Sequence, residues 1–119
     1  MRKHVIIGPV IFLLALSILQ AGNIKVIYPN GGETLRLNSM VNIRWASSGV
    51  QGKVVIVLYR GGIKFHTIAA GAQNTGIFNW RITGNIPAGN QYRIRIRSAA
   101  DLTVNDFSDF DFKIAPPAK

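Results

Sequence analysis

Apolar and polar residues alternate in short segments along most of the chain, with glycine, proline and asparagine between the segments. A period of two places one set of side chains in the core and the other in solvent. In residues 40–46, for example, Val41, Ile43 and Trp45 are expected to face the core. Beyond the N-terminal region no segment has helical periodicity, so the pattern predicts an all-β fold.

Seven or eight strands are expected, at residues 24–28, 34–37, 40–46, 53–60, 63–68, 76–83, 91–98 and 107–114. The 53–60 segment is almost continuously apolar, as a central strand is. Gly61-Gly62 after it predicts a two-residue hairpin turn, because glycine readily adopts the positive φ that such turns require. Short strands at this spacing predict an immunoglobulin-like antiparallel β-sandwich over residues 23–114.

Aromatic residues refine this prediction. A turn containing Pro87 and Gly89 leads into Tyr92, which predicts a tyrosine corner, a hydroxyl bonded to backbone a few residues upstream. The alternative is an ordinary half-buried tyrosine. Trp45 and Trp80 are interpreted as packing anchors rather than exposed platforms for sugar rings.

The two ends of the chain lie outside this domain. A basic cluster precedes the apolar run 5–19, which is short for a membrane span, so residues 1–22 are expected to be a signal peptide cleaved after Ala21 or Gly22. The alternative is an uncleaved N-terminal anchor, which would be the only contact with a membrane. Residues 115–119 are proline-rich and are expected to be a flexible tail.

Net charge and cysteine content limit the locations and binding partners to be expected. The chain has no cysteine, and without Arg2 and Lys3 it carries 12 basic residues against 5 acidic ones, a formal charge of +7. We expect a monomer outside the cell or at its surface that binds an anionic or sugar-rich polymer, or a cell-surface protein. Export argues against nucleic acid as a partner.

The sequence offers few candidate catalytic residues. His66 is the only histidine of the domain and Glu33 the only glutamate, and no Gly-x-Ser-x-Gly nucleophile elbow is present. Asp101 and Asp106 are the best candidates for a calcium site, although their spacing fits no EF-hand loop. We therefore expect no enzyme activity, no cofactor and no metal.

The strongest candidate for a contact surface is one face of the 53–60 strand. If Val54, Ile56 and Leu58 face the core, the alternate side chains face outward next to the arginines of the 91–98 strand. The predicted contact residues are Val55, Val57, Tyr59, Arg95 and Arg97. Alternatively, a second layer covers the valines, and the arginines, partly neutralised by aspartates on the last strand, only make the sheet soluble.

Six segments in order resemble one domain family. They are residues 31–35, 41–45, 52–59, 75–80, 92–96 and 107–114. They are similar to the N-terminal immunoglobulin-like domain of the fungal cell-wall glucan-assembly proteins, the Kre9/Knh-like, Ser/Thr-rich GPI-anchored membrane protein family. The resemblance implies an immunoglobulin-like fold, a cell-surface setting and no active site. It does not extend to a Ser/Thr-rich stalk or a GPI signal, so anchoring and glucan assembly are not carried over.

Overall fold

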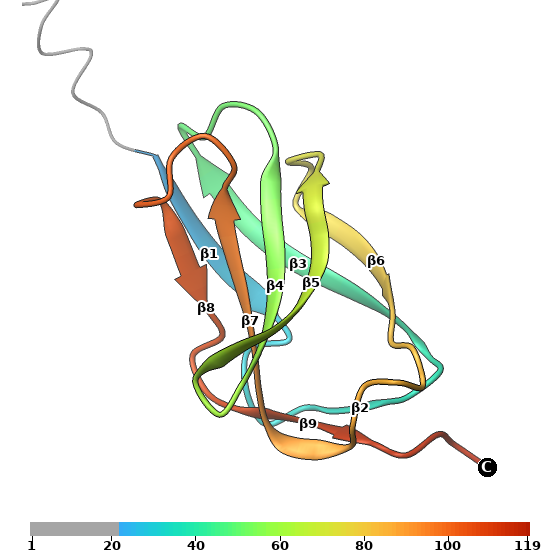
Figure 1. Cartoon of the computed structure of the whole chain (residues 1–119). Helices are drawn as coiled ribbons and strands as arrows, with labels where there is room; N and C mark the ends of the chain where they lie inside the picture. The colour runs from blue at the N-terminus through green and yellow to red at the C-terminus, as the bar shows by residue number, and fades with distance from the viewer. Residues whose placement is uncertain (1–21) are drawn as a thin grey trace, which may run out of the picture.

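The computed structural model describes residues 22–119 and contains nine strands and no helix in that range (Figure 1). The strands are β1 (Asn23–Tyr28), β2 (Thr34–Arg36), β3 (Met40–Ser48), β4 (Val54–Arg60), β5 (Ile63–Ala72), β6 (Ile77–Arg81), β7 (Gly89–Ser98), β8 (Asn105–Phe107) and β9 (Phe112–Ala115). The expected signal peptide lies outside the described residues, apart from Gly22.

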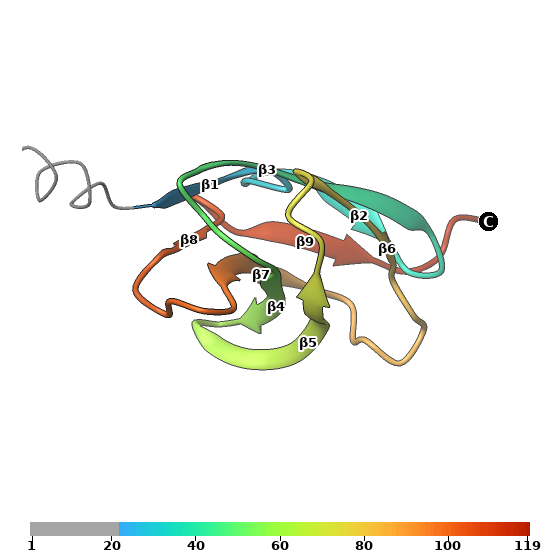
Figure 2. The same cartoon turned by 90° about the horizontal axis from the view of Figure 1, so that it is seen from above.

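The strands form two facing sheets, which confirms the predicted all-β sandwich (Figure 2). One sheet has three strands in the order β1-β3-β6, and the other has the order β2-β9-β7-β4-β5 with β8 also paired to β7. Two details of the prediction were wrong. There are nine strands rather than seven or eight, and β2 pairs with β9 in parallel, so the sandwich is not wholly antiparallel.

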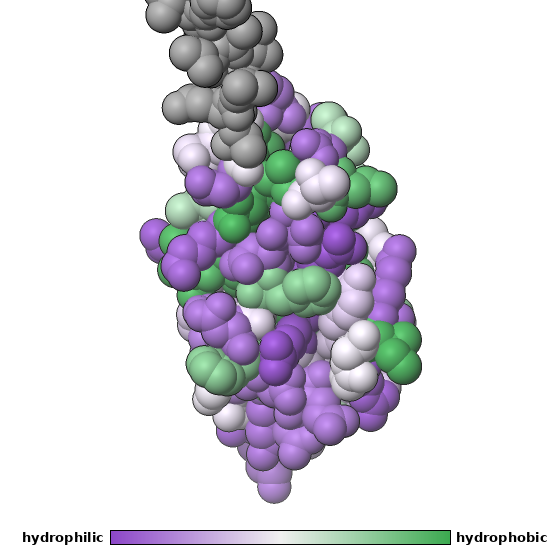
Figure 3. Space-filling view, turned by 90° about the vertical axis from the view of Figure 1, so that its left-hand side faces the viewer, coloured by the Kyte–Doolittle hydropathy of each residue, from purple (hydrophilic) through white to green (hydrophobic). Residues whose placement is uncertain are grey.

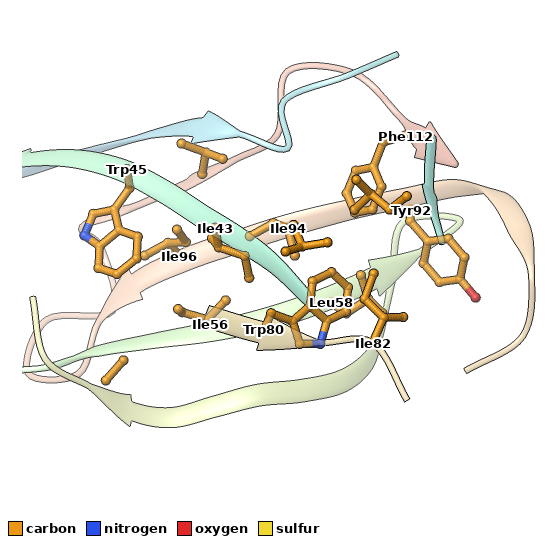
Figure 4. Close-up of a cluster of buried hydrophobic side chains, with 14 of the residues drawn as sticks. Ile43, Trp45, Ile56, Leu58, Trp80, Ile82, Tyr92, Ile94, Ile96 and Phe112 are labelled. Carbon is orange, nitrogen blue, oxygen red and sulfur yellow. The ribbon is translucent and has the colours of Figure 1, made fainter. Parts of the chain in front are cut away.

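A single hydrophobic core fills the space between the sheets (Figure 4). Val41, Ile43 and Trp45 of β3 are buried, as the alternation predicted. Trp45 and Trp80 also belong to the core, which confirms them as packing anchors. Among the described residues, the core cluster lies within residues 24–114.

The predicted tyrosine corner is present. The Tyr92 hydroxyl donates to the Pro87 carbonyl oxygen at 2.5 Å, and the ring is fully buried. The predicted hairpin is present as well: Arg60 pairs with Ile63, and both turn glycines have positive φ. These two features fix the ends of β4, β5 and β7, which carry the candidate site.

The last predicted strand, 107–114, is interrupted. Ser108 is buried, and its Oγ accepts from the Ile94 backbone N–H at 2.9 Å and donates to the Pro29 carbonyl at 2.8 Å. The next residues bond to the turn after β1 instead of to β7, since the Phe110 N–H donates to the Asn30 carbonyl at 3.0 Å. The predicted strand therefore keeps only its two ends, Phe107 in β8 and residues 112–114 in β9. Phe110 between them is 70% exposed, whereas Phe112 is buried.

Candidate functional site

The predicted contact residues lie on the side of the six-stranded sheet that faces away from the core. The pairing of β4 with β7 sets Tyr59 opposite Arg93, Val57 opposite Arg95, and Val55 opposite Arg97. We call this surface the outer face; its residues are Val55, Val57, Tyr59, Arg93, Arg95, Arg97, Asn105 and Phe107. Val54, Ile56 and Leu58 belong to the core, so the predicted register of β4 is correct.

Val55 and Val57 lie on the outer face, but they are not exposed as predicted. Their exposed fractions are 8% and 3%, although neither belongs to the core cluster. Arg95 and Arg97 lie directly across from them and are themselves half-buried. The aliphatic stem of an arginine can cover apolar surface while its guanidinium stays polar, and the register places the two arginines next to the valines. At exposed fractions of 8% and 3%, the valines offer little surface to a ligand.

Arg95 is held in one orientation by three neighbours. Its Nε donates to Asn105 Oδ1 at 3.3 Å, and its Nη1 lies 3.5 Å from the Tyr59 hydroxyl oxygen. Its Cζ lies 5.5 Å from the centre of the Phe107 ring, in cation–π geometry. The Tyr59 and Phe107 rings meet edge to face, with centroids 4.9 Å apart. An oriented guanidinium between two aromatic rings loses little side-chain entropy on binding, so this cluster is preorganised.

A shallow pocket of about 490 Å³ opens beside this cluster. Tyr59 and Phe107 line one part of it, and Gln91, Arg93 and Asp111 supply polar groups. The hairpin glycines of the β4–β5 turn complete the lining. The pocket therefore offers two aromatic rings together with an amide, a guanidinium and a carboxylate.

The charges in the pocket are paired. Arg93 Nε donates to Asp111 Oδ1 at 2.8 Å, with both side chains a little under half exposed. This confirms the expectation that a C-terminal aspartate lies across from one of the arginines. Asp109, another aspartate within the predicted last strand, accepts instead from the Asn30 side-chain amide at 3.0 Å. Because the ion pair is partly solvated, it orients the two groups more than it stabilises the fold.

The predicted contact set and the pocket overlap only in part. Of the five predicted residues only Tyr59 lines the pocket. Arg95 contacts the pocket residues Tyr59 and Phe107 without lining the pocket itself, and Arg97 Nη1 donates to the neighbouring Ser98 carbonyl at 3.3 Å. The residues that the prediction missed are Gly61, Gly62, Gln91, Arg93, Phe107 and Asp111. Arg93 belongs to the same alternating row as Arg95, so the sequence did carry a signal for it. Asp111 also carried a signal, because the aspartates of the last strand were expected to lie near these arginines. Phe107 carried none, because its position depends on the break at Ser108.

The acidic residues serve the fold. Glu33 accepts from the backbone N–H groups of Asn30 and Gly31, and Asp106 Oδ2 accepts from the Val26 N–H at 2.8 Å. Asp101 accepts from the Thr103 hydroxyl and N–H, and these hydrogen bonds hold the pKa of its carboxyl below the usual value. Residues 22–119 contain no group of three histidine or acidic side chains arranged to hold a metal ion.

The surface around β8 is mixed in character. From that side, hydrophobic and hydrophilic side chains alternate over the described residues (Figure 3). The described part of the chain also has no helix long and apolar enough to cross a bilayer. A ligand approaching this side meets polar and apolar groups together.

Two facing sheets, a tyrosine corner and a lateral pocket define a small immunoglobulin-like sandwich module. More particularly, residues 28–114 match the family described as Kre9/KNH-like N-terminal Ig-like domain, and the chain belongs to that family. The resemblance drawn from the sequence motifs is thereby confirmed.

One solved structure shows the same fold. It comes from the Clostridium thermocellum CbhA fibronectin(III)-like modules, with 13% sequence identity and a TM-score of 0.50, and the match covers 80% of this chain and 99% of that one. At this identity the likeness concerns the fold alone. Comparison with curated protein sequences gives no significant match.

Proposed function

We propose that this chain is an exported, non-catalytic immunoglobulin-like module that binds a sugar-rich polymer of the cell surface or cell wall through the outer-face pocket. The observation that carries the proposal is the pocket itself, where two aromatic rings adjoin the Arg93–Asp111 pair and the Gln91 amide. Membership in the Kre9/KNH-like family supports the cell-surface setting.

The chemistry of the pocket suits sugar hydroxyls. A guanidinium donates, a carboxylate accepts, and an amide does both, so neighbouring hydroxyl groups on one ring can be bonded in turn. The Tyr59 and Phe107 rings supply apolar contact for the C–H groups of a sugar. Because Arg93 and Asp111 neutralise each other, the pocket favours a neutral or weakly charged sugar over a dense polyanion.

Binding without catalysis follows from how the carboxylates are used. Each of the five acidic residues accepts a hydrogen bond or forms an ion pair within the fold; the five are Glu33, Asp101, Asp106, Asp109 and Asp111. A glycoside hydrolase needs two carboxyl groups free to exchange protons or attack across one glycosidic bond. We therefore assign the module a binding role at the cell surface, as a monomer.

A glycan array with the domain of residues 22–119 tests the proposal. We expect binding to a defined class of wall or surface glycan, at least ten-fold weaker for Phe107→Ala or Asp111→Asn. The matched control is Phe110→Ala, which removes a phenyl ring from an exposed position outside the pocket. Equal binding by the wild type and both pocket variants, or no glycan bound at all, would refute the pocket as a sugar site.

A protein partner is the second candidate, and the β5 edge is the observation that favours it. Among the strands of residues 22–119, β5 pairs only with β4, and its Ile63 and Phe65 are 72% and 42% exposed. An open edge with apolar side chains can accept an added strand from another protein. Ile63→Lys would abolish such a complex and leave glycan binding unchanged, which separates the two candidates.

A further inference from the structure

The sheet on the opposite side of the sandwich presents a second surface of different chemistry. The residues of β1, β3 and β6 that alternate with the core residues point outward and are exposed. We call this surface the basic face; its principal residues are Lys25, Ile27, Met40, Arg44, Ile77 and Arg81. Figure 2 shows β1 and β3 along one boundary of the molecule, with β4 and β5 along the other.

The basic face carries positive charge without an acidic counterpart. None of the three strands contains an aspartate or glutamate, because all five acidic residues of the chain lie in other segments. The one ion pair found within residues 22–119 joins Arg93 and Asp111, on the other sheet. The cations of this face, Lys25, Arg44 and Arg81, therefore have no ion-pair partner in the described part of the chain.

Exposed aliphatic side chains lie between these cations. Ile27, Met40 and Ile77 are 48%, 53% and 46% exposed. The strand register places Ile77 directly across from Arg44, and Met40 directly across from Arg81. Each arginine thus has an apolar neighbour at the same level of the sheet, over three strands that together are about 10 Å wide.

We propose that the basic face docks on an anionic lipid bilayer. Guanidinium and ammonium groups pair with anionic headgroups, and the adjacent aliphatic side chains enter the boundary between headgroups and acyl chains. A soluble polyanion would satisfy the cations but would leave Ile27, Met40 and Ile77 in water. The apolar residues between the cations, Ile27, Met40 and Ile77, are aliphatic. Tyr28 lies across from Arg44 and is 36% exposed, and a tyrosine beside aliphatic and basic side chains suits the headgroup level of a bilayer.

The two surfaces lie on opposite sides of the sandwich, so docking on a bilayer would turn the pocket away from the membrane. The inference does not depend on the sugar proposal, because it uses other residues and another sheet. Docking through a folded β-surface also differs from retention by an uncleaved N-terminal segment, and it can be tested without that segment.

Vesicle co-sedimentation with residues 22–119 tests the inference. This form is used because the apolar run 5–19 would itself enter bilayers, and because the core cluster of the described residues lies within residues 24–114. We expect binding to vesicles of phosphatidylglycerol and phosphatidylcholine in equal parts, and little binding to phosphatidylcholine alone. Equal binding to both vesicles, or to neither, would overturn the proposal.

Matched double variants distinguish binding through the basic face from a general attraction due to the net charge of the protein. Arg44→Gln/Arg81→Gln and Lys64→Gln/Lys113→Gln each remove two exposed charges, from opposite sheets. Removing two cations at a membrane surface is expected to weaken binding about 30-fold for the first pair, with less than about a three-fold change for the control. Similar losses for both pairs would show that attraction follows total charge, and the basic face would then have no special role. All four positions are exposed, so unchanged thermal melts are expected to verify folding.

A separate variant tests the contribution of the exposed aliphatic side chains to vesicle binding. Ile77→Ser/Met40→Gln keeps all charges, and we expect it to weaken vesicle binding about ten-fold while leaving retention on dextran sulfate unchanged. If this variant binds vesicles as the wild type does, and dextran sulfate displaces the protein from vesicles completely, the face is a polyanion site and the bilayer proposal is wrong.

Discussion

Replacing Trp45 with alanine removes the indole that packs beside Ile96 between the two sheets (Figure 4). Only 3% of the Trp45 surface is exposed, and its Nε1 donates to Asn74 Oδ1 at 2.8 Å. An aromatic side chain of this kind buries about 150–250 Å², or about 4–6 kcal/mol at 25 cal/mol per Å². Tryptophan-to-alanine changes in cores cost about 3–5 kcal/mol. We therefore expect Trp45→Ala to lower the free energy of unfolding by about 4 kcal/mol.

This loss is large for a domain of this size. Domains are stable by about 0.05–0.15 kcal/mol per residue, which gives about 5–15 kcal/mol for residues 22–119. At about 4–8 °C per kcal/mol, Trp45→Ala should lower the melting temperature by about 16–32 °C. Circular dichroism melts and urea titrations of the purified domain measure the change.

Two milder variants isolate the hydrogen bond. Asn74→Ala removes the acceptor while the indole stays packed, and should cost about 1 kcal/mol. Trp45→Phe keeps most of the ring volume and should cost about 2 kcal/mol. Since both remove the same bond, a double-mutant cycle should give a coupling of about 1 kcal/mol. A melting temperature for Trp45→Ala within about 5 °C of the wild type would refute the core role of the indole.

Three further changes test other parts of the fold. Tyr92→Phe should cost about 1 kcal/mol by removing the bond to the Pro87 carbonyl. Burial raises the pKa of the Tyr92 hydroxyl despite the opposing charge of Arg60. The stability of the wild type should therefore fall as the pH rises above about 10, where the hydroxyl ionises in the unfolded chain but not in the folded one. Urea titrations at high pH should show that Tyr92→Phe lacks this part of the loss. Gly62→Ala should cost about 1–2 kcal/mol in the same assay, because Gly62 has a φ of 80° in the hairpin turn; no loss would mean a different turn. EDTA should not shift the melting temperature, since Asp101 already accepts from Thr103, and a fall of several degrees would reveal a structural cation.

Part of the candidate site could be predicted because it follows from strand periodicity. Alternation in β7 sets Arg93, Arg95 and Arg97 on one face whatever the rest of the fold does. Membership of Tyr59 in the same face required only that β4 pair with β7, which the immunoglobulin-like strand order supplies. The burial of Val55 and Val57 did not follow, because it depends on how neighbouring long side chains lie across the sheet.

The sequence by itself determined the all-β class, the core face of β3 and β4, the β4–β5 hairpin and the tyrosine corner. Each of these depends on residues close together in the chain or on a strict period of two. Tertiary structure alone decided the division of the last strand. The Ser108 hydroxyl, rather than a backbone carbonyl, accepts the Ile94 N–H, and the Phe110 N–H donates to the carbonyl of Asn30, eighty positions away in the chain. Contacts between such distant segments leave no periodic signal, yet they place Phe107 and Asp111 in the pocket and leave Phe110 in solvent.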